Sequence, residues 1–115
     1  MRAHVQEIVF DCADPAALAR FWSALLGGSP VDRSPDWSYV DPPGFTRIAF
    51  QRVPEGKSAK NRLHLDVEVA DPLAAADEVL PLGARRSGGP VTDEQGTFQV
   101  MHDPEGNEFC FVTGG

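Results

Sequence analysis

The chain has 115 residues, of which 42% are hydrophobic and 23% charged, and its formal net charge is −7. This size and composition are typical of one soluble globular domain, and the acidic balance argues against nucleic-acid binding, which requires cationic side chains beside the phosphates. No apolar run approaches the ~20 residues of a membrane span and no signal segment follows Met1, so a cytoplasmic protein without a membrane partner is expected.

The first predicted strand covers residues 4–12 (HVQEIVFDC), where polar and apolar residues alternate and Glu7 falls on the polar face. Asp14 and Pro15 then predict the start of a helix. Aspartate caps a helix N-terminus, and proline fits the first helical position because its missing N–H is not needed there. The helix is expected to end at Gly27, the first residue of a Gly-Gly pair.

The next region, residues 29–44, is rich in proline and glycine and contains one short strand candidate, Trp37–Val40. Residues 46–53 (TRIAFQRV) alternate again, with Gln51 on the polar face of the predicted strand. Residues 54–60 (PEGKSAK) are polar and contain helix and strand breakers, so they are predicted to form a linker.

The second half repeats this plan. Residues 62–69 (RLHLDVEV) form the most regular strand pattern in the chain, with His64 and Asp66 on its polar face. Asp71, followed by proline, predicts a second helix that ends at Gly83.

The remainder is predicted to be β structure. Residues 84–91 give a weak strand pattern interrupted by glycine, and residues 96–102 and 107–112 give stronger ones. Between these two strands, residues 103–106 (DPEG) form a turn that matches the DPPG sequence of residues 41–44.

Two Asp-Pro helix starts and two Asp-Pro-x-Gly turns recur in the same order, which indicates an internal duplication. We therefore predict a single α+β domain, residues 1–115, built from two tandem βαβββ modules at about 1–55 and 61–115. One helix cannot cover both faces of a sheet. The polar face of each sheet is therefore expected to face a cleft, a partner protein or water.

Three stretches carry a family resemblance: FDCADPAALARFWSALLGG, KNRLHLDVEVADP and HDPEGNEFCFV. They resemble the glyoxalase-like domain branch of the vicinal oxygen chelate superfamily, which includes glyoxalase I, extradiol dioxygenases, and fosfomycin- and bleomycin-resistance proteins. The resemblance covers essentially the whole chain. It implies a curled mixed sheet with a concave cleft, helices on the outer face, a small-molecule ligand and a homodimer.

The resemblance also implies a divalent metal in the cleft. By position, its ligands would be Glu7, His64 and Cys110, with Ala49 or Gln51 as the fourth position. This set lacks the two histidines and one carboxylate of iron oxygenases and the paired glutamates of glyoxalase I, so extradiol dioxygenation is disfavoured. Imidazole, thiolate and carboxylate together could bind zinc or another divalent metal, but the departures from the family pattern favour a cleft without a metal cofactor.

Two functions follow as hypotheses. In the first, the protein is a glyoxalase-like lyase or isomerase in which Glu7 and His64 are catalytic, with Gln51, Asp66 and Cys110 beside them.

In the second, the cleft binds a small or antibiotic-like molecule without chemistry, and Trp37 and Tyr39 stack on a flat ligand. Structural alternatives stay open for the same residues. His64 could pair with Glu7 or Asp66, and Cys110 could be a small buried apolar residue. The two aromatic side chains could belong to a dimer interface.

Overall fold

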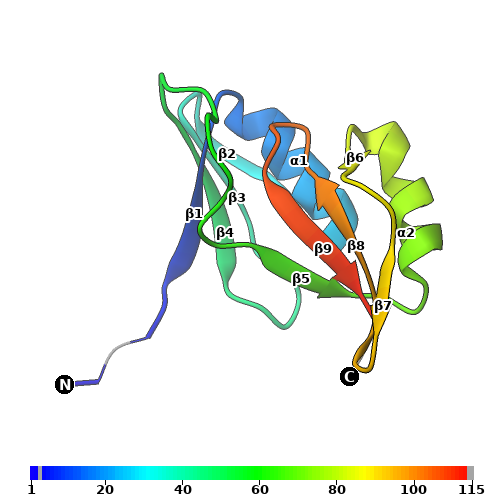
Figure 1. The fold of residues 1–115 in the computed structure, drawn as a ribbon. Helices are drawn as coiled ribbons and strands as arrows, with labels where there is room; N and C mark the ends of the chain where they lie inside the picture. The colour runs from blue at the N-terminus through cyan, green and yellow to red at the C-terminus, as the bar shows by residue number, and fades with distance from the viewer. Residues whose placement is uncertain (3, 114–115) are drawn as a thin grey trace. The chain divides into compact units, whose positions relative to one another are not determined.

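The computed structural model describes residues 1–2 and 4–113 and divides the chain into two compact units, Met1–Gly56 and Lys57–Gly115. Each unit combines one helix with one mixed sheet, which confirms the α+β class and the tandem βαβββ plan. Figure 1 follows the two modules along the chain, from blue to red.

The first module consists of β1 (Glu7–Cys12), α1 (Pro15–Leu26), β2 (Val31–Ser34), β3 (Trp37–Val40) and β4 (Arg47–Arg52). Its strands lie in the order β1-β4-β3-β2, with β1 parallel to β4 and the other neighbours antiparallel. The opening and closing strands of the module are therefore direct neighbours. Strand β2 was not predicted, because three of its four residues are polar and all four are exposed.

The second module consists of β5 (Leu65–Glu68), α2 (Pro72–Val79), a 3-10 turn η1 (Leu80–Leu82), β6 (Arg85–Arg86), β7 (Val91–Asp93), β8 (Gly96–His102) and β9 (Glu108–Val112). The strand order β5-β9-β8-β6, with β7 also paired to β8, repeats the first sheet, and β5 again runs parallel to β9. The weak strand predicted at 84–91 is divided into β6 and β7 by the Gly-Gly-Pro sequence between them.

Both helices begin where their Asp-Pro pairs predict. The Asp14 carboxylate accepts a hydrogen bond from the backbone N–H of Ala17 at 3.2 Å. The Asp71 carboxylate accepts from Leu73 at 3.0 Å and Ala74 at 3.3 Å. These bonds satisfy N–H groups that the first helical turn cannot pair internally. No helix in the described part of the chain has the length and apolar character that a membrane span requires.

Each module has its own aromatic core on the helix side of its sheet. In the first, Trp22 of α1 packs edge-on against Phe10 with ring centroids 5.8 Å apart, and Phe10 meets Phe50 at 5.7 Å. In the second, Phe109 and Phe111 of β9 are buried with their rings 5.4 Å apart. The period of two in a strand then directs the intervening residues of β4 and β9 to the opposite, helix-free faces.

Candidate functional site

The helix-free face of the second sheet brings together residues that lie far apart in the sequence. Asp66 of β5 is the direct partner of Cys110 in the parallel β5–β9 pair. His64 lies one residue before β5, since the strand spans 65–68 rather than the predicted 62–69. His64, Asp66 and Cys110 therefore share one part of this face, although His64 lies outside the strand to which it was assigned.

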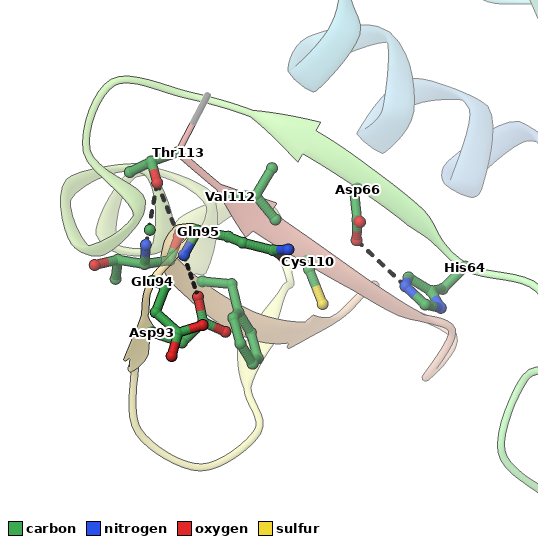
Figure 2. Close-up of a pocket in the computed structure, with 11 residues that line it drawn as sticks. His64, Asp66, Asp93, Glu94, Gln95, Cys110, Val112 and Thr113 are labelled. Carbon is green, nitrogen blue, oxygen red and sulfur yellow. Dashed lines mark hydrogen bonds and ion pairs between the residues drawn. The ribbon is translucent and has the colours of Figure 1, made fainter. Parts of the chain in front are cut away.

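These three side chains form a group of possible metal ligands. One donor atom from each lies within 4.8 Å of the others, and His64 Nε2 is 3.2 Å from Asp66 Oδ1. Figure 2 shows this pair beside the Cys110 sulfur at one end of a pocket. Zinc accepts nitrogen, oxygen and sulfur ligands at about 2.0–2.3 Å in tetrahedral geometry, which places neighbouring donors roughly 3.5 Å apart. Small side-chain rotations would reach that spacing, so the donor set fits zinc.

Burial and charge both act on the Cys110 thiol. Its partial burial and the nearby Asp66 carboxylate raise the thiol pKa, and Lys60 opposes them more weakly. The thiol is therefore protonated near neutral pH, which argues against an activated nucleophile. A metal that binds Cys110 must displace this proton, because the thiolate is the ligand form.

The pocket beside the donors has a volume of about 680 Å³. Its lining comprises His64, Asp66, Asp93, Glu94, Gln95, Gly96, Thr97, Phe98, Cys110, Val112 and Thr113. Three carboxylates give it an acidic character, which suits a cation or a polar group that donates hydrogen bonds.

The wall of this pocket is the turn between β7 and β8. The Asp93 carboxylate accepts a hydrogen bond from the N–H of Gln95 at 2.9 Å, and Thr113 Oγ1 accepts one from Thr97 at 3.0 Å. The sequence did not suggest Asp93 or Glu94 as site residues. Asp93 ends β7 and Glu94 lies in the turn that follows it, and their place directly before the strand predicted at 96–102 was the available indication.

The site residues predicted in the first module lie together on the helix-free face of its sheet. Trp37 is paired with Gln51, and Tyr39 with Ala49, across β3 and β4. Glu7 joins this face through its register with Arg47 in the β1–β4 pair. Ala49 is fully buried and offers no ligand atom. Glu7 does not belong to the donor group of the second module, so its part in a metal site stays a prediction.

Each of the two aromatic candidates has an arginine over its ring. The Arg33 guanidinium lies 4.7 Å from the Trp37 ring centroid, and that of Arg47 lies 3.7 Å from the Tyr39 centroid. Arg47 is held by Asp41 through bonds of 2.8 and 3.1 Å, which raise the Arg47 pKa and lower that of Asp41. A flat ligand would therefore stack on the opposite ring face or on the guanidinium.

The Trp37 indole also has an unsatisfied donor. Its Nε1 is buried and has no hydrogen-bond acceptor among residues 1–2 and 4–113. Trp37 and Gln51 line a second cavity of about 770 Å³ at the end of the first sheet. Buried donors are nearly always paired in folded proteins, so this N–H is ready to bind an acceptor atom of a water or a ligand.

A protein-family model described as "Glyoxalase-like domain" matches residues 7–112. No curated protein matches the sequence. Several solved structures match the fold. A glyoxalase/bleomycin resistance protein/dioxygenase family enzyme from Burkholderia phytofirmans PsJN is 22% identical, with a TM-score of 0.76 over 96% of this chain and 98% of that one.

Two further similar structures are of proteins connected with antibiotics. The bleomycin-binding protein of Streptomyces verticillus, complexed with copper(II)-bleomycin, is 22% identical with a TM-score of 0.66, and each chain is fully covered. The fosfomycin resistance protein FosX from Mesorhizobium loti is 18% identical with a TM-score of 0.75, over 100% of this chain and 95% of that one. At these identities the likeness extends to the fold alone.

Proposed function

The chain belongs to the glyoxalase-like domain family, and we propose that it is a lyase or isomerase acting on a small polar molecule in the second-module pocket. The observation that supports this most directly is the convergence of His64, Asp66 and Cys110 within 4.8 Å in the pocket wall. These residues would hold a zinc ion. When bound, zinc supplies Lewis-acid polarisation of a substrate oxygen.

The other residues of the pocket would bind the substrate and move a proton. Phe98 and Val112 offer apolar contacts, while Asp93 and Glu94 are carboxylates that can accept a proton from a carbon or oxygen acid. Glu7, on the helix-free face of the first sheet, remains our proposal for a further catalytic carboxylate. As the family resemblance implies, we propose that the protein works as a homodimer.

Metal analysis of protein without a histidine tag tests the proposal. The wild-type chain should bind stoichiometric zinc, and His64→Ala should weaken that binding roughly a hundredfold or more, because a direct ligand is lost. His4→Ala is the matched control, since it removes an exposed imidazole outside the donor group. The metalloenzyme proposal is contradicted if the wild-type protein binds no zinc in equilibrium dialysis. It is also contradicted if His4→Ala lowers zinc affinity as much as His64→Ala does.

A binding protein without chemistry is the second candidate, and the unsatisfied Trp37 N–H favours it. The Streptomyces verticillus relative is a bleomycin-binding protein, and a flat, acceptor-rich ligand could use both the N–H and the ring of Trp37.

Bleomycin, with and without copper, is the first ligand to test for this candidate. Its binding is measured by fluorescence titration of the protein. Trp37→Leu should weaken binding about tenfold, which corresponds to the ~1.4 kcal/mol of one aromatic contact. Phe45→Leu is the control because Phe45 is 52% exposed in the same module and lies outside the cavity. Equal affinities of Trp37→Leu and wild type would rule out this use of Trp37.

A further inference from the structure

A second pocket of the second module has the opposite electrostatic character from the first. It has a volume of about 620 Å³ and is lined by Lys57, Ser58, Ala59, Lys60, Arg85, His102, Pro104, Glu105, Gly106 and Glu108. Three permanent cations and two carboxylates face it, in a chain whose net charge is −7. Such a local excess of positive charge attracts anions.

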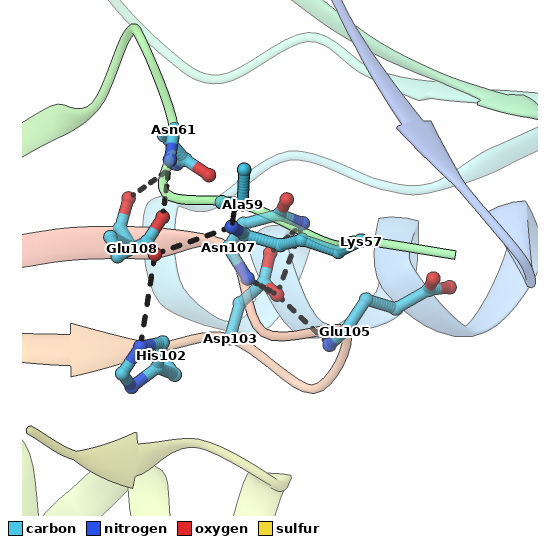
Figure 3. A network of polar contacts seen from close by, with 8 residues as sticks. All are labelled: Lys57, Ala59, Asn61, His102, Asp103, Glu105, Asn107 and Glu108. Carbon is cyan, nitrogen blue, oxygen red and sulfur yellow. Dashed lines mark hydrogen bonds and ion pairs between the residues drawn. The ribbon is translucent and has the colours of Figure 1, made fainter. Parts of the chain in front are cut away.

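One of the two carboxylates is already neutralised by its neighbours. Glu108 Oε1 lies 3.3 Å from Lys57 Nζ, and its other oxygen accepts the backbone N–H of Asn61 at 3.0 Å. The Asn61 side chain also donates to the Glu108 carbonyl at 3.1 Å. Figure 3 shows these contacts joining Lys57 and Asn61 to Glu108 at the start of β9. His102 lies on the other side of Glu108. The segment that carries Lys60 is therefore held in place.

The remaining cations are unpaired. Within the described chain, Lys60 and Arg85 make no ion pair with any carboxylate, while Glu105 contributes the other negative charge of the lining. Arg85 is the cross-strand partner of His102 in the β6–β8 pair, so the guanidinium and imidazole share one face. A guanidinium offers a planar pair of N–H donors that matches a carboxylate or phosphate, and an ammonium adds a point charge.

We propose that this pocket binds the oxyanion of a small molecule, a carboxylate or a phosphate, through Lys60 and Arg85. Glu108 of this pocket and Cys110 of the metal donors lie two residues apart on the same face of β9, so the two sites are neighbours on one sheet. The substrate would then be an anionic small molecule whose charged group lies in the oxyanion pocket while its reacting oxygen faces the metal donors. This link to a substrate rests on the proposed function, whereas the oxyanion pocket itself does not.

Titration of metal-free, isotope-labelled protein followed by NMR tests the oxyanion pocket directly. Inorganic phosphate and malonate are the two probes, with sodium chloride keeping the ionic strength constant. Either probe should shift the backbone signals of residues 57–61, Arg85 and His102 along a saturable curve. The relative affinities of the two probes distinguish a phosphate site from a carboxylate site.

Lys60→Met and Arg85→Met should each weaken binding about tenfold, the loss of one charge-assisted contact. Arg62→Met is the matched control, because it removes one positive charge from an exposed residue next to the same segment but outside the pocket. Lys60 provides an independent variant if Arg85→Met disturbs strand β6.

The oxyanion pocket is overturned if the shifts do not saturate or if Arg62→Met weakens binding as much as Arg85→Met. Zinc binding by the wild type, measured separately, distinguishes this outcome from failure of the proposed function. Saturable phosphate binding without zinc binding would leave the oxyanion pocket and remove the metalloenzyme. Zinc binding without phosphate or malonate binding would leave the metalloenzyme and remove the oxyanion pocket.

Discussion

Zinc affinity should rise with pH and should depend on Cys110. The folded protein raises the Cys110 thiol pKa, so below that pKa each bound zinc must displace one proton. Affinity should then increase about tenfold for each pH unit between about pH 7 and 8.5. Cys110→Ser should bind zinc roughly a hundredfold more weakly and should lose this pH slope, because a hydroxyl is a poor anionic ligand.

Competition with a chromophoric chelator at several pH values measures both effects. Asp66→Asn is the informative comparison, because it weakens the donor set but leaves the thiol in place. It should retain a pH slope with a lower affinity. A Cys110→Ser variant with the wild-type slope would mean that the thiol is not a ligand.

Trp22→Ala should cost about 3–5 kcal/mol of folding free energy, the range for deletion of a buried aromatic side chain. Trp22 is fully buried and packs edge-on against Phe10 and Phe21, so its removal leaves a cavity and deletes both of these ring contacts. Folded domains of this size are stable by about 5–15 kcal/mol, and the first module would be close to unfolding.

Urea denaturation followed by circular dichroism measures this loss. Phe45→Ala is the control from the same module, because a half-exposed phenylalanine contributes little, and it should change stability by less than about 0.5 kcal/mol. Similar midpoints for the two variants would contradict the assignment of Trp22 to the core.

The parts of the fold that the sequence predicted depend on short-range physics. Asp14 and Asp71 cap their helices through hydrogen bonds to residues two or three positions away. The local Asp-Pro sequence was therefore enough to locate both helix starts. Strand β2 was missed because its structure depends on distant partners. Val31 pairs with Tyr39, and the Asp32 carboxylate accepts the hydroxyl of Ser38 at 2.8 Å.

Only part of the candidate site was predicted, because the rest depends on pairing between strands that are distant in the sequence. The family resemblance, carried over by counting from the repeated turns and helix starts, implied His64 and Cys110, which the fold does bring together. Asp66 was expected as a ligand-binding residue, and its place among the metal donors follows from the β5–β9 register, which has no local sequence pattern. Strand β5 is shorter than predicted: it begins at Leu65, which pairs with Phe109, and Leu63 before it is 63% exposed.

The parallel pairing of opening and closing strands has a consequence for how the chain is made. Glu7 pairs with Arg47, and Leu65 with Phe109, so each opening strand meets its partner only after some forty further residues have been synthesised. Until then its backbone donors and acceptors are available to other chains. Closing such long loops is entropically slow, and we expect the hairpins and helices of each module to form before its first strand is captured.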